Sequence, residues 1–381
     1  MKVLELTQRF PPAIGGVEEH VFHLARGLSQ AGDDVEVLTT DLLRDTPFER
    51  IVSVSPADAV AVTRVRAWKF FEAPHGLGVA APTMVRAAVA RHPEVLHAHG
   101  YGYFPTFAGA FGSALDGAAL VITPHSDAGR ASRTKRMFDS VVPKFTLGRA
   151  RRVIAVSQHE AGHLRRLGVA GEKISVIPNG VELSEFESMG FPRRNRSPLT
   201  GLFVGRVYPA QKGLETLIGA VALLPRPAQV HFRIVGEDWG GSSLLLQLAE
   251  RLGVADALTF VGRLDRRALL QEYANADFLV VPSYFEPFGI VILEGMAAEL
   301  PVIASRVGGI PEVVADGDSG LLVEPGDPHA LADAIVCLSQ DEGLRKAMGR
   351  MGKQRARGFA WASIVQQVRR VYGQTLEERS S

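Results

Sequence analysis

The stretch that decides the fold runs from Lys2 to Thr40 and reads KVLELTQRFPPAIGGVEEHVFHLARGLSQAGDDVEVLTT. Two short apolar runs, KVLELT and DVEVLTT, flank a Gly/Pro loop and the amphipathic stretch VEEHVFHLARGLSQAG. Short apolar runs are typical of buried strands, and a helical period between two of them is typical of a βαβ unit. The chain therefore opens as an α/β protein with a parallel sheet.

The same alternation continues along the whole chain. In the first half the runs VLHAH, ALVITPH, RVIAVS and ISVIPNG follow one another, with Ala- and Leu-bearing segments between several of them. In the second half GLFVGR, VHFRIVG, LTFVGR, DFLVVPS, PVIAS and GLLVEP alternate with helical stretches such as GLETLIGAVALLP. Two successive arrays of this kind predict two Rossmann-like, doubly wound domains facing a central cleft, with ligands at the carboxyl ends of the strands.

The domain boundaries follow from a break in this pattern. The segment ELSEFESMGFPRRNRSPLT is rich in charge, Pro and Ser and has no sustained period, as expected for a linker. We therefore expect an N-terminal domain over residues 1–185, a linker over 186–198 and a C-terminal domain over 199–360. Residues 361–381 are expected to form an amphipathic helix that could pack back on the N-terminal domain.

Composition narrows the class of protein. Hydrophobic residues are 46% and charged residues 22% of the sequence, which is typical of a globular rather than a disordered chain. The net charge of +1 argues against a general nucleic-acid-binding protein. A lone cysteine, Cys337, is predicted to occupy a buried helix position. The sequence lacks a signal-peptide pattern and a membrane-spanning apolar run, so we expect a cytoplasmic protein.

Two carboxylates bracket the apolar stretch FEPFGIVILEGMAA, residues 285–298. Glu286 follows the buried strand run DFLVVPS, and Glu294 lies about two turns into a helix expected to begin near Phe288 or Gly289. The simpler interpretation makes Glu286 a helix-dipole partner and Glu294 a solvated residue. The alternative is a ligand site, because helix amides near Ile290 suit a phosphate and carboxylates accept hydrogen bonds from sugar hydroxyls.

A site for phosphate also needs fixed cations. The segment FVGRVYPAQKG places Arg206 and Lys212 in the loop after the first strand of the second domain. A guanidinium and an ammonium group can neutralise a pyrophosphate there. Ordinary solvated surface charges are the alternative interpretation.

The first domain offers weaker signals. Gly16 belongs to a Gly-Gly pair between strand and helix, which a tight turn explains as well as a phosphate does. His125, in ITPHSD, follows a strand, where a structural histidine is the alternative. The run LHAHGYGY carries His97 and His99 at another strand end, but without a convincing third ligand, so no metal site is predicted.

Together these segments resemble a known family. GRVYPAQKG, EPFGIVILEGMAAELPVIAS, GGIPEVVADGDSGLLVEPGD, SVIPNGVE and the N-terminal GGVEEHV are similar to motifs of the family-four retaining glycosyltransferases with the GT-B fold. The resemblance covers nearly the whole chain. It implies an N-terminal acceptor-binding domain and a C-terminal domain that binds a nucleotide sugar.

The resemblance also implies roles for individual residues. Arg206 and Lys212 match the basic pair that holds the donor diphosphate. Glu286 matches a glutamate against the transferred sugar, with the amides of Phe288, Gly289 and Ile290 on the phosphates and sugar. Glu294 matches a second glutamate, which holds the ribose hydroxyls.

In the N-terminal domain, His125 resembles a histidine that faces the donor sugar, and Gly16 resembles a glycine that approaches donor phosphate or acceptor. The chain departs from the family at VGEDWGGSS, where many relatives carry a compact Gly-x-Gly-Pro turn. Members of this kind need no bound metal, and the sequence has no Asp-x-Asp cluster. No cofactor is therefore expected beyond the nucleotide sugar as co-substrate.

The function that the resemblance implies is transfer of a hexose-type sugar from a nucleotide diphosphate sugar to a hydroxyl acceptor, with retention of configuration. Three alternatives stay open. Glu286 and Glu294 could be the acid/base pair of a glycosidase. The chain could be a nucleotide-sugar epimerase of the same architecture, or a non-catalytic protein that binds a nucleotide sugar.

The acceptor is the least determined feature. Tyr101, Arg130 and Arg133 are candidate acceptor-binding residues, the two arginines within the basic segment GRASRTKRMFDSVVPKFTLGRARR. A solvated helix face is the simpler interpretation. The alternatives are a phosphorylated or lipid-linked acceptor and peripheral contact with an anionic membrane, for which RVRAWKFF, residues 64–71, adds a basic-aromatic stretch.

Overall fold

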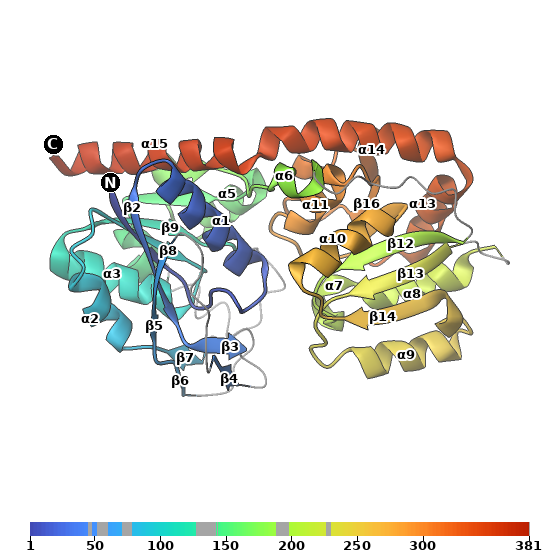
Figure 1. Cartoon of the computed structure of the whole chain (residues 1–381), viewed down its shortest axis with the longest axis horizontal. Helices are drawn as coiled ribbons and strands as arrows, with labels where there is room; N and C mark the ends of the chain where they lie inside the picture. Colours follow the sequence, from blue (N-terminus) through green and yellow to red (C-terminus); the bar gives the residue numbers. More distant parts are fainter. Residues whose placement is uncertain are drawn as a thin grey trace. The chain divides into compact units, whose positions relative to one another are not determined.

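The computed structural model describes residues 1–44, 48–51, 60–70, 78–126, 142, 144–187, 198–225 and 230–380. The chain forms two compact units, which are described separately (Figure 1). Unit 1 comprises Met1–Asn179 and Trp361–Ser381, and unit 2 comprises Gly180–Ala360. In the described part of the chain, no helix combines the length and the apolar composition needed to cross a membrane.

Unit 1 is built on a seven-stranded sheet in the order β11-β10-β9-β8-β1-β2-β5, with parallel neighbours throughout. Counted from the first strand outward, this is a Rossmann-type order that reverses between β1 and β8. The strands are β1 (Lys2–Leu6), β2 (Asp34–Thr40), β5 (Ala61–Val65), β8 (Val95–His99), β9 (Ala119–Thr123), β10 (Arg152–Ala155) and β11 (Ile174–Val176). Two small antiparallel pairs accompany the sheet, β3 (Leu42–Arg44) with β4 (Glu49–Arg50) and β6 (Trp68–Lys69) with β7 (Val79–Ala80).

The strands of unit 1 bury both faces because side chains alternate between them. Leu4, Leu96 and Leu120 belong to the core that includes α2 (Thr83–Val89) and α3 (Phe104–Asp116). Val3, Val95 and Val121 belong to the core on the other face, with α1 (Gly16–Gln30) and α15 (Trp361–Ser380). The C-terminal helix thus packs beside the N-terminal one. Unit 1 also contains α5 (Gln158–Arg166) and the short 3-10 helix η2 (Gly171–Lys173).

Unit 2 repeats the design with a six-stranded parallel sheet in the order β14-β13-β12-β15-β16-β17. Here the order reverses between β12 and β15, which again is the Rossmann pattern. The strands are β12 (Leu199–Val204), β13 (Val230–Val235), β14 (Leu258–Gly262), β15 (Phe278–Val281), β16 (Val302–Ser305) and β17 (Gly320–Val323).

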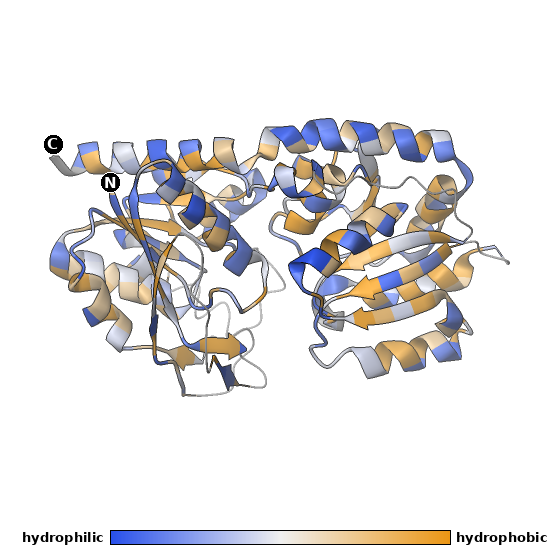
Figure 2. Ribbon diagram, in the orientation of Figure 1, coloured by the Kyte–Doolittle hydropathy of each residue, from blue (hydrophilic) through white to orange (hydrophobic). Residues whose placement is uncertain are grey.

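Helices cover both faces of this second sheet (Figure 1). One face packs on the helices α8 (Leu214–Leu223), α9 (Ser242–Arg251) and α13 (Pro328–Gln340), and α10 (Arg266–Asn275) and α11 (Ile290–Ala297) lie on the other. The other helices are α6 (Leu183–Glu187), α7 (Pro209–Lys212), η3 (Ala255–Ala257), α12 (Ile310–Val313), α14 (Glu342–Ala356) and η4 (Arg357–Phe359). Figure 2 shows mostly hydrophobic strands between helices that are banded with hydrophilic residues. This pattern is expected where helices cover both faces of a sheet and expose their outer sides to water.

The predicted fold class, two doubly wound α/β domains, is confirmed. Every apolar run quoted from the sequence contains a strand of one of the two sheets, whereas β5 and the two small antiparallel pairs were not predicted. The prediction for Cys337 was wrong, because this cysteine is exposed on α13. Ten of the residues assigned to the linker, 188–197, lie outside the described part of the chain.

Candidate functional site

In an open parallel sheet, ligands bind where the strand order reverses, at the carboxyl ends of the two strands that flank the reversal. In unit 2 these strands are β12 and β15. Arg206 follows β12 by two residues, Lys212 ends the short helix α7 in the same loop, and Glu286 lies in the loop after β15. The sheet order therefore brings Glu286 to the loop that carries Arg206 and Lys212, although it lies 74 residues beyond Lys212 in the sequence.

A close backbone approach joins the two loops. Gly213, directly after Lys212, has φ 62°, and a Cβ atom at this position would lie 1.9 Å from the carbonyl oxygen of Pro282. Only glycine fits there. As a result Lys212 Nζ donates a hydrogen bond to Glu286 Oε2 at 2.8 Å, with both side chains about 15% exposed. The predicted phosphate-binding lysine and the predicted sugar-facing glutamate thus form an ion pair.

Arg206 lies against an aromatic ring from the next loop. Its guanidinium carbon is 4.5 Å from the ring centroid of Trp239, a cation–π contact. The Trp239 indole N–H donates to Glu237 at 3.0 Å. Asp238 accepts hydrogen bonds from the backbone N–H groups of Gly240, Gly241 and Ser242 and so caps α9. The segment that departs from the family motif is therefore an internally bonded turn that orients Arg206.

The helix after β15 begins at Ile290, close to the predicted start. Gly289 precedes it in the left-handed region, at φ 93°, a conformation that favours glycine. The Phe288 side chain is 2% exposed and packs against Phe359, with ring centroids 6.0 Å apart. Phe288 therefore anchors the loop, and its backbone amide is the part that a ligand could use.

Glu294 is buried, so the interpretation as a solvated residue was wrong. One carboxylate oxygen accepts a hydrogen bond from Arg266, and the other accepts from the Tyr273 hydroxyl at 2.8 Å. Arg266 also donates to Glu185 at 2.5 Å. Burial alone would lower the pKa of Arg266, but Glu294 and Glu185 raise it, and burial beside Glu294 raises the pKa of Tyr273. Glu294 is thus a fixed carboxylate held by two donors.

The corresponding edge of unit 1 holds a buried polar cluster. Its side chains lie on the same face of β1 and β8 as Val3 and Val95. Glu5 on β1 is fully buried and in register with His97 on β8, and His99 shares that face two residues on. Glu5 Oε2 accepts from His99 Nε2 at 2.7 Å, and Oε1 accepts from the Tyr372 hydroxyl of α15 at 3.0 Å. Burial alone would raise the pKa of Glu5, but His97 and His99 lower it well below its usual range.

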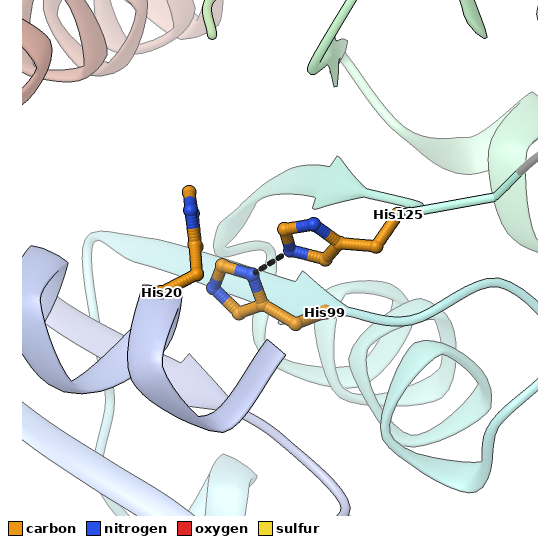
Figure 3. Close-up of side chains that lie close together, drawn as sticks. All are labelled: His20, His99 and His125. Atoms are coloured by element: carbon orange, nitrogen blue, oxygen red, sulfur yellow. Dashed lines mark hydrogen bonds between the residues drawn. The ribbon is translucent and has the colours of Figure 1, made fainter. Parts of the chain in front are cut away.

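His125 extends this cluster to the end of β9. His99 Nδ1 lies 3.3 Å from His125 Nε2, and the ring of His20 from α1 meets His125 edge-on at a centroid distance of 4.6 Å (Figure 3). His125 is partly exposed and has φ 49°, a strained value for a residue with a side chain. Burial and neighbouring imidazoles lower the pKa of His20 and His125 well below 6.5 and that of His99 to about 4. All three rings are therefore neutral at pH 7.

Two overlapping groups in the described part of the chain place three metal-ligating side chains within 4.8 Å of one another: His20, His99 and His125, and Glu5, His97 and His99. The fold thus supplies the third ligand that the His-x-His run lacked in the sequence. The hydrogen bonds from His99 to Glu5 and between His99 and His125 already account for the closeness of these groups.

Two other predicted site residues of unit 1, Gly16 and Tyr101, lie at the same carboxyl edge. Gly16 is the first residue of α1, and the preceding Gly15 is extended. Tyr101 is half-buried and donates its backbone N–H to the carbonyl of Pro124 at 2.7 Å, next to His125. Arg130 and Arg133 lie outside the described residues.

Several residues that hold these side chains in place were not predicted from the sequence. Glu5 could have been suspected, because a carboxylate inside the apolar run KVLELT must find partners. His20 follows the Gly-Gly pair closely enough to have been considered with it. No local signal marked Arg266, Tyr273 or Tyr372, since each acts through a contact made by tertiary folding.

Comparison with known families now adds to this geometry. Residues 14–185 match the model of Glycosyltransferase Family 4, and residues 186–355 match that of Glycosyl transferases group 1. The D-inositol 3-phosphate glycosyltransferase of Acidothermus cellulolyticus is 34% identical over 96% of this chain and 87% of its own. The chain belongs to glycosyltransferase family 4. The resemblance inferred from the sequence is confirmed.

Other members of the family show how far the likeness extends. The glycogen synthase of Mycobacterium tuberculosis is 30% identical over 98% of this chain and 94% of its own. Among solved structures, the sucrose-phosphate synthase of Thermosynechococcus elongatus superimposes with a TM-score of 0.79 at 27% identity, covering 99% of both chains. Anabaena HepE in complex with UDP and glucose shares the fold at a TM-score of 0.78 and 24% identity, over 98% of this chain and 99% of its own. The chain is a glycosyltransferase with the GT-B fold.

Proposed function

We propose that this glycosyltransferase moves a hexose-type sugar from a nucleotide diphosphate sugar to a hydroxyl acceptor and retains the configuration of the sugar. The observation that carries the proposal is the grouping of Arg206, Lys212 and Glu286 at the strand-order reversal of unit 2. Two cations and a carboxylate suit a pyrophosphate linked to a sugar. The names of the relatives support this class of reaction, since they include a D-inositol 3-phosphate glycosyltransferase, a glycogen synthase and a sucrose-phosphate synthase.

In the proposed reaction the bond between the anomeric carbon and the phosphate oxygen breaks, and the acceptor oxygen bonds to the same face of that carbon. The acceptor proton passes to the departing phosphate, so the products are a glycoside and a nucleoside diphosphate. Arg206, Lys212 and the first amides of α11 stabilise the charge that develops on the leaving group. The reaction needs no bound metal in this proposal, because these groups supply the positive charge.

The two glutamates have different proposed roles. Glu286 orients the transferred sugar, and Glu294 accepts hydrogen bonds from the ribose hydroxyls of the nucleotide. Arg266 and Tyr273 hold Glu294 in a fixed position, so a ribose would meet a preset acceptor rather than a mobile side chain. A carboxylate has about four acceptor positions, which leaves capacity beyond these two donors.

For the acceptor we propose a hydroxyl-bearing molecule that carries a phosphate or a lipid-linked group, bound in part by Tyr101, Arg130 and Arg133. In support of a phosphorylated acceptor, two relatives carry the name D-inositol 3-phosphate glycosyltransferase. Peripheral contact with an anionic membrane stays a prediction. In its support, Trp68 and Phe70 are 47% and 68% exposed, beside the basic residues Arg66 and Lys69. Sedimentation with anionic liposomes at low and high salt tests it, and no binding at low salt would end it.

The first experiment identifies the donor. A panel of nucleotide sugars is screened for thermal stabilisation of the full chain, because a ligand at a hundredfold its dissociation constant adds about 2.7 kcal/mol. The best donor then enters transfer assays with candidate acceptors in excess chelator, where we expect full activity. Activity lost to chelation and restored by magnesium or manganese would contradict the metal-free proposal.

The same assays test the alternative activities. Conversion of the donor without any acceptor would favour an epimerase. Release of sugar from simple glycosides, without a nucleotide donor, would favour a glycosidase.

The second experiment separates the two glutamates. A hydrogen bond to a charged group contributes roughly 1.5 to 3 kcal/mol, so Glu294→Gln should weaken binding of the nucleoside diphosphate about tenfold to a hundredfold. Glu286→Gln should leave that affinity nearly intact and depress transfer. Calorimetric titration and turnover measurements give the comparison. Equal losses of nucleotide affinity, or undiminished transfer in Glu286→Gln, would reject these roles.

A further inference from the structure

The buried cluster of unit 1 is a directed chain of hydrogen bonds. It begins at Glu5, which is ionised and can only accept. The 2.7 Å contact between Glu5 Oε2 and His99 Nε2 therefore places a proton on that nitrogen. Since a neutral imidazole carries one N–H group, the other nitrogen of His99, Nδ1, must be an acceptor.

The next link follows from the first. His99 Nδ1 lies 3.3 Å from His125 Nε2, and a hydrogen bond between two ring nitrogens needs one donor. His99 cannot supply it, so His125 Nε2 carries the proton. Nδ1 of His125 then holds a lone pair on the edge of the ring turned away from His99 (Figure 3). The carboxylate of Glu5 thus sets the proton position of a ring with which it has no direct hydrogen bond.

We propose that Glu5 and His99 are positioning residues that hold His125 with its proton on Nε2, so that Nδ1 accepts a hydrogen bond from a hydroxyl group of the substrate. The inference rests on the proposed function, which supplies a substrate that carries hydroxyl groups. It adds the direction of the contact: the substrate hydroxyl donates and the enzyme accepts. It also gives a role to two residues that never touch the substrate.

The backbone around His125 supports a fixed ring. The residues before it are tied to the end of β8, because the carbonyl of Thr123 accepts from the N–H of Gly100 at 3.0 Å and that of Pro124 accepts from Tyr101 at 2.7 Å. These bonds hold His125 in its left-handed conformation. Beside it, Nδ1 of His20 is buried and has no hydrogen-bond partner among the described residues. A polar ligand next to these imidazoles would meet more than one acceptor or donor site.

Nuclear magnetic resonance tests the proton position directly. The full chain is labelled with nitrogen-15 in its 11 histidines, and the signals of His125 are assigned by comparison with His125→Asn. Nitrogen shifts distinguish a protonated from an unprotonated ring nitrogen, and couplings to the ring protons tell Nε2 from Nδ1. We expect a neutral His125 protonated on Nε2 at pH 7.5. A proton on Nδ1 would overturn the proposal, whatever the variants do.

A pair of variants on one strand tests the relay. His99→Gln keeps an amide donor near Glu5 and removes the ring nitrogen Nδ1 that accepts from His125. His97→Gln is the matched control, since it also removes a buried imidazole 3.2 Å from Glu5 but one whose hydrogen bonds go to Tyr372 and Thr123. In His99→Gln we expect nitrogen shifts of His125 that are averaged between the two neutral forms of the ring. We also expect a threefold to tenfold lower kcat, which corresponds to the loss of one hydrogen bond. His97→Gln should keep the wild-type pattern and kcat per folded molecule.

The outcomes separate this inference from the function on which it rests. Equal losses of kcat in both variants, with an unchanged His125 spectrum, would show a structural role only and reject the relay. If no nucleotide sugar is ever transferred but the spectrum shows Nε2 protonation that depends on His99, the proposed function fails while the relay stands. If transfer is found and His125 carries its proton on Nδ1, the function stands and the relay fails.

Discussion

The two strand-order reversals of the molecule have the same geometry and opposite chemistry. In unit 1 the edge between β1 and β8 is lined by neutral imidazoles around one buried carboxylate, Glu5. In unit 2 the edge between β12 and β15 is lined by permanent ions, the pair Lys212–Glu286 and the pair Arg266–Glu294. The fold therefore fixes where a site forms, and the side chains at the strand ends decide what it can do.

The difference matches two different tasks. A diphosphate needs charge that does not vary with pH, and Lys and Arg supply it near neutrality. A hydroxyl group needs an oriented donor or acceptor, and a neutral imidazole offers one of each. We therefore expect the stability of unit 1 to depend on pH. In unit 2 we expect the removal of a single charged side chain to lower the rate of transfer.

The largest expected effect is acid destabilisation confined to unit 1. His20, His99 and His125 have pKa values below 6.5 in the fold, so the unfolded chain takes up protons first as pH falls. Above about pH 6.5 these rings are neutral in both the folded and the unfolded state, and the free energy of unfolding has its full value. On acidification toward pH 4 the unfolded chain binds protons that the folded chain does not, and the free energy of unfolding falls. His99 alone, with its pKa near 4, should lower the free energy of unfolding by about 2 kcal/mol between pH 7 and pH 5. In unit 2 burial raises the pKa of Glu215 and Asp277, which acts in the opposite direction.

Hydrogen exchange at pH 7 and pH 5, corrected for intrinsic rates, measures this in the full chain. Peptides from β1 and β8 should lose more protection than peptides from β12 and β15. His99→Gln serves as the control, because it removes one of the three titrating rings and should reduce the difference. An equal loss of protection in both units would break the contrast between them.

The second effect is on catalysis. Lys212→Met keeps the apolar stem and removes the charge, so transfer should fall about a hundredfold to a thousandfold, as for loss of one donor to a developing charge. Lys346→Met is the matched control, because Lys346 forms an exposed ion pair with Glu342 in the same unit. The control should transfer at the wild-type rate.

Steady-state kinetics with the best donor provide the measurement. A loss that appears only in KM, with kcat unchanged, would assign Lys212 to ground-state binding and not to the leaving group. A similar loss in both variants would point to general destabilisation of unit 2.

Much of this arrangement could be predicted from local sequence. The six apolar runs of unit 2 contain its six strands, and Arg206, Lys212 and Glu286 follow the strands as expected, because a buried parallel strand and its polar exit leave a clear local pattern. The strand β5 was missed since AVTRV mixes polar residues into an edge strand that is half-buried. Its pattern gives neither a continuous apolar run nor a strong turn signal.

The partners of the site residues could not be predicted in the same way. Tyr372 reaches Glu5 across 367 residues of sequence, and Arg266 reaches Glu294 from a different helix. Such contacts depend on which helix packs on which face of a sheet. The periodicity of the sequence shows only which face of a helix is apolar, and not the sheet face or helix on which it packs. The exposed position of Cys337 has a similar cause, because its apolar neighbours made the whole helix α13 read as buried.

The smallest expected effect compares two buried tyrosines. Tyr372 donates its hydroxyl hydrogen to Glu5 at 3.0 Å in unit 1, and Tyr273 donates to Glu294 at 2.8 Å in unit 2. Replacing either by Phe keeps the ring and removes one hydrogen bond to a carboxylate, which contributes about 1.5 to 3 kcal/mol. Tyr372→Phe also removes the 2.7 Å hydrogen bond between its hydroxyl and His97 Nδ1. Tyr372→Phe should cost the upper part of that range, because Glu5 is fully buried and keeps only imidazole donors. Tyr273→Phe should cost the lower part, because the Arg266 guanidinium still compensates Glu294.

Hydrogen exchange of each variant at pH 7 gives both free energies, from β1 and β8 peptides for Tyr372→Phe and from α10 and α11 peptides for Tyr273→Phe. Each variant is the control for the other, since both lose a hydroxyl that donates to a buried carboxylate, and His97→Gln measures the hydrogen bond between His97 and Tyr372 separately. A larger cost for Tyr273→Phe would mean that the fixed ions of unit 2 compensate its carboxylate less well than neutral imidazoles do in unit 1. That result would reverse the contrast between the two sites, because a permanent cation at hydrogen-bond distance should stabilise a buried carboxylate more than a neutral N–H group.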